Sequence, residues 1–269
     1  MAAIAKFLSD DHHPIEIAFY RNLMVFIGFI IFLAFSGKWH LVKTKRPQAH
    51  LARGFVGTLG LICGFWSVSL LPLATATTLF YTAPLLVTIL SIPMLGERVG
   101  IPRYVAIFIG FLGVVLVVKP NGQELVILGL FFAFFDVVFS ALTQIFLRDL
   151  GRTENHLTTV FYYMGIGVVV SGLLMPFVWT DIPKVENILL FIGLGLTGGI
   201  QQIAKTKGYS LAPISVTGPI NYTGIIWAAI FGWVFWDTLP TWSVILGALI
   251  IILSNIFILW RENRKNNNV

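Results

Sequence analysis

Nine separate apolar stretches, each about twenty residues long, fill most of this 269-residue chain. A helix of that length spans the hydrocarbon core of a bilayer, roughly 30 Å thick at about 1.5 Å of rise per residue. Charged residues make up only 11% of the chain, against about 25% in soluble domains. The sequence therefore predicts an all-α polytopic membrane protein. Its expected spans are residues 14–36, 50–71, 74–95, 102–118, 125–147, 157–177, 187–207, 213–236 and 241–260.

The basic residues predict the orientation of these spans, because Lys and Arg are enriched in short cytoplasmic loops. Most of the 18 Lys and Arg residues fall on one side when the spans alternate. We therefore expect a cytoplasmic C-terminus in a bacterial cytoplasmic (inner) membrane. The formal charge of +6 lies in these loops and does not indicate a nucleic-acid partner. The residues assigned to the cytoplasmic side are Lys38, Lys43, Lys45, Arg46, Arg53, Arg98, Arg103, Arg148, Arg152, Lys205, Lys207, Arg261, Arg264 and Lys265.

The second half of the chain repeats landmarks of the first half. Residues 71–76 (LPLATA) are echoed by residues 211–216 (LAPISV), and Glu97 meets Asp237 at the same offset. This register predicts two five-helix repeats, residues 1–118 and 125–261, followed by a cytoplasmic tail, residues 262–269. Five is an odd number, so the two halves would cross the membrane in opposite senses, as in many carriers. The alternative is chance similarity between apolar helices.

The N-terminal residues resemble the end of the first helix of the second repeat. Lys6, Phe7 and Leu8 match Arg148, Asp149 and Leu150. Residues 1–8 are too short to cross a bilayer. We therefore expect ten helices in the full arrangement, with the first one truncated by about 18 residues and nine full spans remaining.

Several short motifs occur in one order along the whole chain. They are Ala5, Lys6 and Leu8, then Phe19, Tyr20 and Arg21, then Gly96 and Glu97 in one half and Trp236 and Asp237 in the other. In this order the chain resembles the EamA-type branch of the drug/metabolite transporter superfamily. The resemblance implies a ten-helix fold and secondary transport of a small organic metabolite through a central cavity.

Two charged residues lie deep inside predicted spans, where charge is costly and usually functional. Asp136 lies half-way along span 125–147, where it could bind a cationic group, carry a proton, or form a structural hydrogen bond. Arg21 lies seven residues into its span and could anchor an anionic substrate bidentately. It could equally pair with Glu16 or Asp136, or reach the interface. Lys6 is expected to reach the outer headgroups.

Polar and aromatic residues elsewhere in the spans are further substrate-binding candidates. Gln201 and Gln202 are adjacent, so only one of them should face the centre. Lys205 is either a counter-charge for substrate or an interface anchor. Pro84 and Pro219 loosen two helices at repeat-related places, so three polar residues next to these prolines are also binding candidates. Trp66 offers a flat surface for a ring-bearing ligand. The three polar residues are Tyr81, Asn221 and Tyr222.

The leading hypothesis is a secondary active transporter that works by alternating access, proton-coupled or by exchange. Its partners would be a small-molecule substrate and the lipid bilayer. A membrane-embedded enzyme is the alternative, but the spans contain no recognisable catalytic motif. No cofactor is indicated, and the oligomeric state is open, with a monomer compatible. Residues 10–13 (DDHH) could suggest a metal, but we expect a solvated outer turn because no distant His or Cys cluster completes a site.

Overall fold

The computed structural model describes residues 1–95, 100–118, 127–178, 185–211 and 222–266. The described part is helical throughout and has no strand, which confirms the predicted all-α membrane class. Within these described ranges, eight helices are long and apolar enough to cross a membrane, and Thr223–Trp236 is a shorter apolar helix. The helices are α1 Ala2–Leu8, α2 Pro14–Ser36, α3 Pro47–Leu70, α4 Leu73–Phe80, α5 Ala83–Leu95, α6 Ile101–Val118, α7 Ile127–Leu150, α8 His156–Leu174, α9 Val185–Leu211, α11 Thr223–Trp236 and α12 Trp242–Asn266, with short 3-10 turns η1 Trp39–Val42 and η2 Met175–Phe177.

Local sequence signals set the ends of α2. His13 lies at the N-cap, where its Nδ1 accepts a hydrogen bond from the Ile15 N–H at 3.3 Å, and Pro14 follows at the first helical position. The helix ends at Gly37, whose φ of 65° lies in the left-handed region that glycine adopts without strain. The side chain of Asn155 caps α8 in the same way as His13 caps α2.

The predicted span 74–95 is divided into α4 and α5 at Tyr81 and Thr82. Pro84 has no N–H to donate to a carbonyl one turn earlier, so the helical ladder is interrupted there. The Nδ2 of Asn255 on α12 donates to the Tyr81 carbonyl at 3.1 Å. The break therefore exposes a backbone acceptor that a neighbouring helix satisfies.

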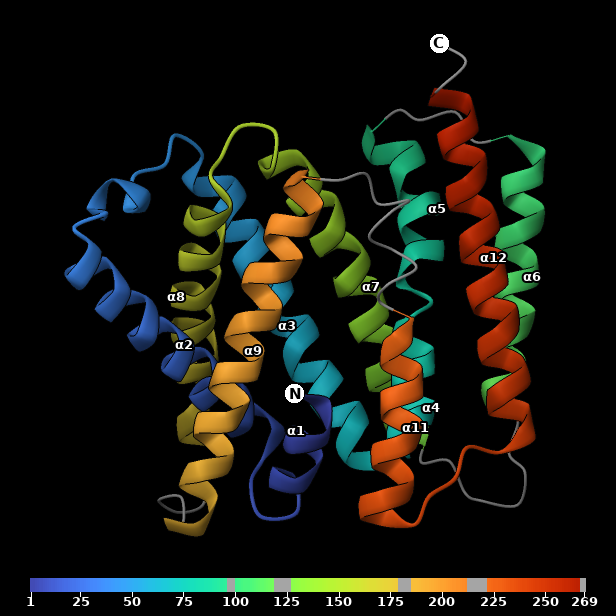
Figure 1. Ribbon diagram of the computed structural model, residues 1–269, viewed down its shortest axis with the longest axis horizontal. Coiled ribbons are helices and arrows are strands. Elements are labelled where there is room, and N and C mark those ends of the chain that lie inside the picture. Colours follow the sequence, from blue (N-terminus) through green and yellow to red (C-terminus); the bar gives the residue numbers. More distant parts are fainter. Residues whose placement is uncertain (96–99, 119–126, 179–184, 212–221, 267–269) are drawn as a thin grey trace.

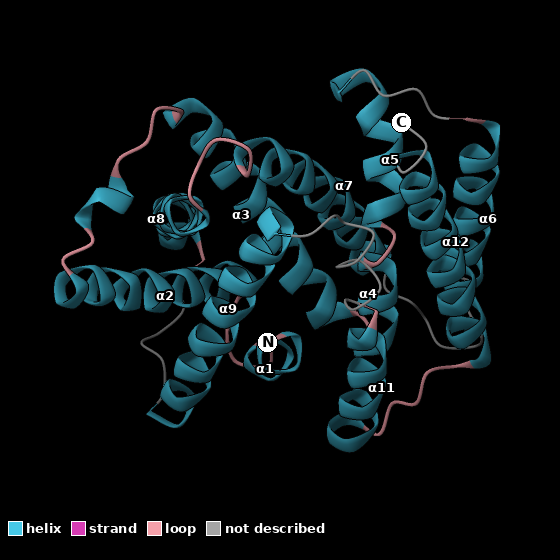
Figure 2. Ribbon diagram, turned by 45° about the horizontal axis from the view of Figure 1, so that its top comes forward, coloured by secondary structure: helices cyan, strands magenta, loops and turns pink. Residues whose placement is uncertain are grey.

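The helices form two groups joined through the middle of the molecule (Figure 1). Helices α2, α8 and α9 lie on one side and α5, α6 and α12 on the other, and α3 packs along α7 between them. Figure 2 shows the short α1 beside α9, and α4 next to α11. The tail of α12 and the turn between α7 and α8 lie at the same end of the bundle in Figure 1.

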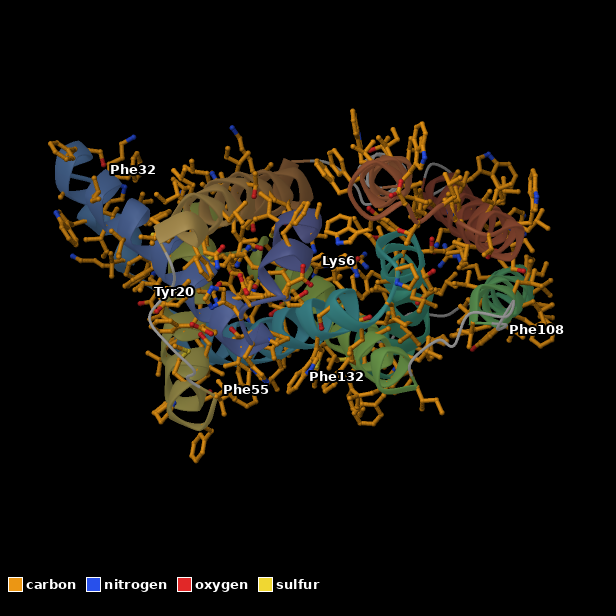
Figure 3. All side chains as sticks on the ribbon, turned by 90° about the horizontal axis from the view of Figure 1, so that it is seen from below. Lys6, Tyr20, Phe32, Phe55, Phe108 and Phe132 are labelled. Atoms are coloured by element: carbon orange, nitrogen blue, oxygen red, sulfur yellow. The ribbon has the colours of Figure 1, made fainter. Side chains whose placement is uncertain are left out.

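The outside of the bundle is apolar, as a lipid-facing surface requires. Phe32, Phe55 and Phe108 point outward at the edges of the molecule in Figure 3 and are 40%, 51% and 66% exposed. Polar side chains are instead found inside, among α2, α3, α7, α8 and α9. Apolar side chains outside and polar ones inside are the reverse of the arrangement in a soluble protein. The few charged side chains that the bundle buries are therefore the candidates for a functional site.

Candidate functional site

Asp136 lies near the middle of α7 and is 8% exposed. Its carboxylate faces the glycines of α3, where a Cβ at Gly64 would come within 3.1 Å of Asp136 Oδ1 and one at Gly60 within 3.8 Å. The two glycines therefore make room for the carboxylate where α3 and α7 pack closely. Lys205 on α9 and Ser140 one turn along α7 are the groups that act on it electrostatically or by hydrogen bonding.

Arg21 on α2 is 2% exposed and makes no ion pair with Glu16 or Asp136. Its Nη1 donates to Asn22 Oδ1 at 2.8 Å, and its Nη2 donates to the Gly198 carbonyl at 3.2 Å. A Cβ at Gly198 would lie 2.6 Å from Arg21 Nε, so a larger residue there would displace the guanidinium. The guanidinium is thus held by neutral groups from α2 and α9.

Arg53 was expected among the cytoplasmic loop charges, and this expectation is wrong. The residue lies inside α3, is 2% exposed, and places Arg53 Cζ 3.9 Å from the ring centroid of Tyr163 on α8. Arg21 Cζ lies 5.7 Å from the same centroid. Sequence reasoning missed both Arg53 and Tyr163, although the position of Arg53 inside the predicted span 50–71 was an available signal.

Lys205 completes a central cluster of four charged residues, which we call the charge cluster: Arg21, Arg53, Asp136 and Lys205. Lys205 is half-buried on α9 and interacts electrostatically with the other three members. Among the described residues, the ion pairs within 4.0 Å are His12–Glu16, Arg46–Asp149 and His50–Glu154. The charge cluster thus combines three cations with one carboxylate and contains no close ion pair.

The other predicted site residues make contacts of their own. Gln202 is buried, with its Nε2 donating to Thr206 Oγ1 at 3.2 Å, whereas Gln201 is exposed. The rings of Tyr81 and Tyr222 meet edge to face with centroids 5.4 Å apart, between α4 and α11. Asn221 lies outside the described residues.

Trp66 lies near the turn between α1 and α2. Its ring stacks on Phe132 with centroids 4.3 Å apart and an interplanar angle of 7°, and His13 meets it edge on at 4.8 Å. Figure 3 shows Phe132 at the margin of the bundle and Lys6 further inside. Lys6 does not reach outward as expected, because its Nζ donates to the carbonyls of Val68 and Leu71, each at 2.8 Å.

The turn at residues 10–13 is only partly solvated, in contrast to the expectation. His12 is 8% exposed, and its Nδ1 lies 3.3 Å from Glu16 Oε2, while Asn187 of α9 lies 3.0 Å from its Nε2. Within the part of the chain that the structure describes, no group of three His, Cys, Asp or Glu side chains could hold a metal ion. The turn therefore fastens α2 to α9.

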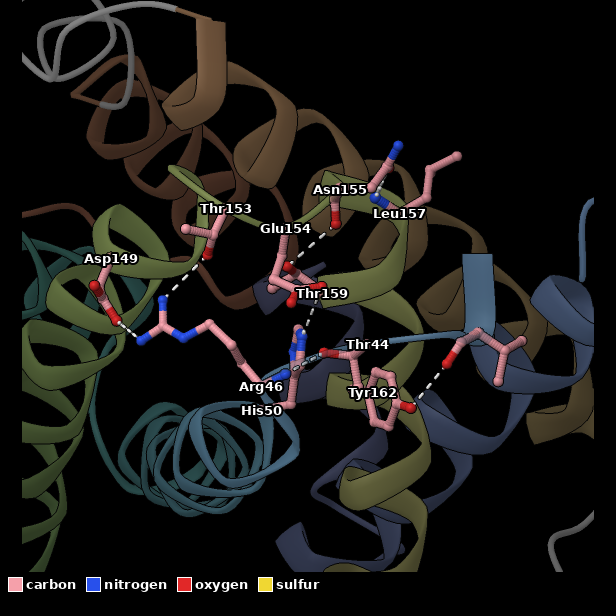
Figure 4. A network of polar contacts seen from close by, with 11 residues as sticks. Thr44, Arg46, His50, Asp149, Thr153, Glu154, Asn155, Leu157, Thr159 and Tyr162 are labelled. Carbon is pink, nitrogen blue, oxygen red and sulfur yellow. Dashed lines mark hydrogen bonds and ion pairs between the residues drawn. The ribbon is translucent and has the colours of Figure 1, made fainter. Parts of the chain in front are cut away.

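A second polar network lies at the opposite end of α2, where α3 begins (Figure 4). Arg46 donates from Nη2 to Asp149 Oδ2 at 2.6 Å and from Nη1 to Thr153 Oγ1 at 3.1 Å. One turn further along α3, His50 Nε2 lies 3.6 Å from Glu154 Oε2. This network connects α3 to the turn between α7 and α8. Together with the turn at residues 10–13, it places polar contacts between helices near both ends of α2.

The sequence profile of the EamA-like transporter family matches residues 1–119 and again residues 127–260. The chain belongs to the EamA-like transporter family. It is therefore an integral membrane protein of a transporter family, as the eight apolar spans in the described part of the chain also indicate.

Curated relatives carry transporter names. A protein of Rickettsia bellii named S-adenosylmethionine uptake transporter is 29% identical over 97% of this chain and 89% of its own length. The pseudopaline exporter CntI of Pseudomonas aeruginosa is 26% identical over 95% of this chain and 89% of its own length. A crystal structure with 18% sequence identity shares the fold, with a TM-score of 0.70 over 98% of this chain and 96% of that one.

Proposed function

We propose that the protein is a secondary active transporter that moves a small organic metabolite by alternating access, with the charge cluster as its substrate site. The observation that carries this proposal is the buried Asp136 carboxylate, which interacts electrostatically with Lys205 of α9 without a close ion pair. Lys205 in turn interacts electrostatically with Arg21 and Arg53. Charges inside a membrane bundle are expensive and usually mark a solute pathway. The family and the transporter names of its relatives support transport rather than catalysis.

The packing of the helices supports an inverted repeat of residues 1–118 and 125–261. When the first half is exchanged with the second in the register of the repeat, α5 corresponds to α11, and the pairs α2 with α8 and α6 with α12 map onto themselves. Other packed pairs map onto one another: α3 with α8 onto α9 with α2, α3 with α7 onto α9 with α1, α2 with α3 onto α8 with α9, and α5 with α7 onto α11 with α1. Such two-fold exchange is what alternating access between equivalent halves requires.

The proposed orientation places the C-terminus in the cytoplasm of a bacterium, with the protein in the inner membrane. Basic residues support it, because Arg46, Arg152 and Lys43 lie at the end of the bundle where α2 and α7 finish. A monomer would suffice, since the charge cluster is built from one chain. Coupling would use either a proton on Asp136 or a second solute that moves in the opposite direction.

Reconstitution into liposomes tests this function. Labelled S-adenosylmethionine and a set of amino acids are offered with and without a proton gradient, and uptake and counterflow are measured against protein-free liposomes. Asp136→Asn should lower the initial rate on the order of tenfold or more, which corresponds to about 1.4 kcal/mol or more. Asp237→Asn is the matched control, because Asp237 is exposed and its left-handed φ of 51° suits Asn.

Unchanged transport by Asp136→Asn would remove the charge cluster from the mechanism. Failure of every solute to move faster than in protein-free liposomes would count against the proposed activity itself.

A further inference from the structure

The two buried arginines of the charge cluster have donors that no side chain or carbonyl satisfies. Among the described residues, three of their donor atoms are buried without a hydrogen-bond partner. They are Arg21 Nε, Arg53 Nε and Arg53 Nη1. Both residues are 98% buried, and no carboxylate lies within 4.0 Å of either guanidinium among the described residues. Buried donors in folded proteins are normally paired.

The surroundings do not explain why these charges are retained. A buried guanidinium cannot lose its charge, and leaving it unpaired inside a bilayer protein costs several kcal/mol. The Tyr163 ring contributes a cation–π contact to Arg53 at 3.9 Å and a weaker one to Arg21 at 5.7 Å. Such cation–π contacts are too weak to offset the burial of two cations.

We propose that Arg21 and Arg53, which share the ring of Tyr163, form an oxyanion subsite that binds the carboxylate of the transported solute. The inference rests on the proposed function and names the substrate class of the same site. The planar fork of a guanidinium matches the two oxygens of a carboxylate, and two forks can saturate the four lone-pair sites of one carboxylate. A bound carboxylate would also satisfy the orphan donors.

The rest of the charge cluster fits a solute that carries both signs of charge. Asp136 lies on α7 and is the acidic member, so a cationic group of the solute would face it while the carboxylate faces α2 and α3. Lys205 interacts electrostatically with Asp136 from α9 without pairing closely with it. The site therefore favours a carboxylate-bearing metabolite with an amino or other cationic group.

Thermal unfolding of the purified protein in detergent tests the subsite with simple probes. Sodium acetate, sodium phosphate and sodium chloride are compared at equal ionic strength. We expect acetate to raise the melting temperature of the wild type above its value in chloride. Arg53→Gln and Arg21→Gln should abolish this shift, and Arg103→Gln should keep it, because Arg103 is a buried arginine on α6, a helix outside the cluster.

Two further readouts separate a binding role from a structural one. Without added oxyanion, Arg53→Gln should melt at the same temperature as the wild type or higher, because an unpaired buried charge is removed. Arg53→Lys keeps the charge but loses the fork, so its half-saturating acetate concentration should rise on the order of tenfold. Arg53→Lys also carries the test if the Gln variants do not fold.

Equal melting temperatures of the wild type in acetate and chloride would overturn the subsite, and so would an undiminished acetate shift in Arg53→Gln. Stabilisation by phosphate alone would overturn the carboxylate assignment. The proposed function fails separately, through absent transport in liposomes. Asp136-dependent transport without any acetate effect would leave transport standing and remove only the subsite.

Discussion

The ammonium of Lys6 binds the C-terminal end of another helix, α3. Its ammonium donates to the carbonyl of Val68, in the last turn of α3, and to the carbonyl of Leu71, the C-cap residue of α3. It also lies 5.7 Å from the centroid of the Trp236 ring. The C-terminal carbonyls of a helix carry partial negative charge and lack helical donors. Lys6 therefore acts as a C-cap for α3 that is supplied by α1, a segment more than sixty residues earlier in the chain.

Replacing Lys6 with Met should destabilise the protein by about 2 kcal/mol, because charge-assisted hydrogen bonds are lost while the length of the side chain is kept. The measurement is the free energy of unfolding in a titration of mixed micelles with sodium dodecyl sulfate. Lys43→Met is the control, since Lys43 is exposed and should change this free energy little. A Lys6→Met protein as stable as the control would contradict the capping role.

Single residues also show where the sequence is informative and where it is not. The depth of Asp136 and Arg21 could be read from their distance to the ends of their spans. The partners of these residues could not, because spans that are apolar on every face do not indicate which side faces the bundle. Arg53 was misassigned for a related reason, since a charge near the start of a span is compatible with an interface as well as with burial. Tyr163 carried no signal at all among the aromatic residues.

At the scale of elements, α2 depends on a histidine cap. The Nδ1 of His13 can accept from Ile15 N–H only when the imidazole is neutral. Burial lowers the pKa of His13 below its ordinary value of 6.5, while the nearby Glu16 carboxylate opposes this shift. Because the folded-state pKa is the lower one, this contribution to stability is present above pH 6.5 and is lost as the pH falls through the folded-state value.

His13→Ala should cost about 1 kcal/mol of stability at pH 8, and His13→Asn should cost little, because Asn is a good N-cap. At pH 5 the wild type should lose its advantage over His13→Ala, whereas His13→Asn should keep it. Melting temperatures of the three proteins at both pH values check this. An advantage of the wild type over His13→Ala that is equal at both pH values would show that the cap does not titrate.

The break between α4 and α5 was foreseeable from Pro84, and the helix boundaries at Pro14, Gly37 and Asn155 followed from ordinary capping signals. The contact that closes the break was not foreseeable. Asn255 is more than 170 positions from Tyr81, and nothing in either segment indicates the other. Local chemistry predicts where helices end, but only packing decides which helix satisfies an exposed carbonyl.

At the scale of the whole molecule, the proposed inverted repeat makes a prediction about sidedness. In that proposal the turn after α1 corresponds to the turn after α7, and Figure 1 places the two turns at opposite ends of the bundle. Asp10 and Arg152 are exposed residues in these two turns. Because the sole cysteine, Cys63, is half-buried, it can be replaced by Ala to give a background for labelling.

In right-side-out vesicles, an impermeant maleimide should label Asp10→Cys and leave Arg152→Cys unmodified, and inverted vesicles should give the reverse. The outcome is read by the mass shift of the protein on a gel. Labelling of both cysteines from one side would refute the antiparallel insertion of the halves, whatever the substrate.

The charge cluster has three cations and one carboxylate, and this excess of positive charge would make its free energy depend on the membrane potential. A site with surplus positive charge that is carried across the field of an energised membrane changes in free energy by about 2.3 kcal/mol per charge and 100 mV. Under the proposed alternating access, voltage would then bias which way the empty transporter faces. A bound solute that neutralises part of the excess positive charge would reduce this bias. The electrical work of reorientation would then differ between the solute-bound and the empty protein.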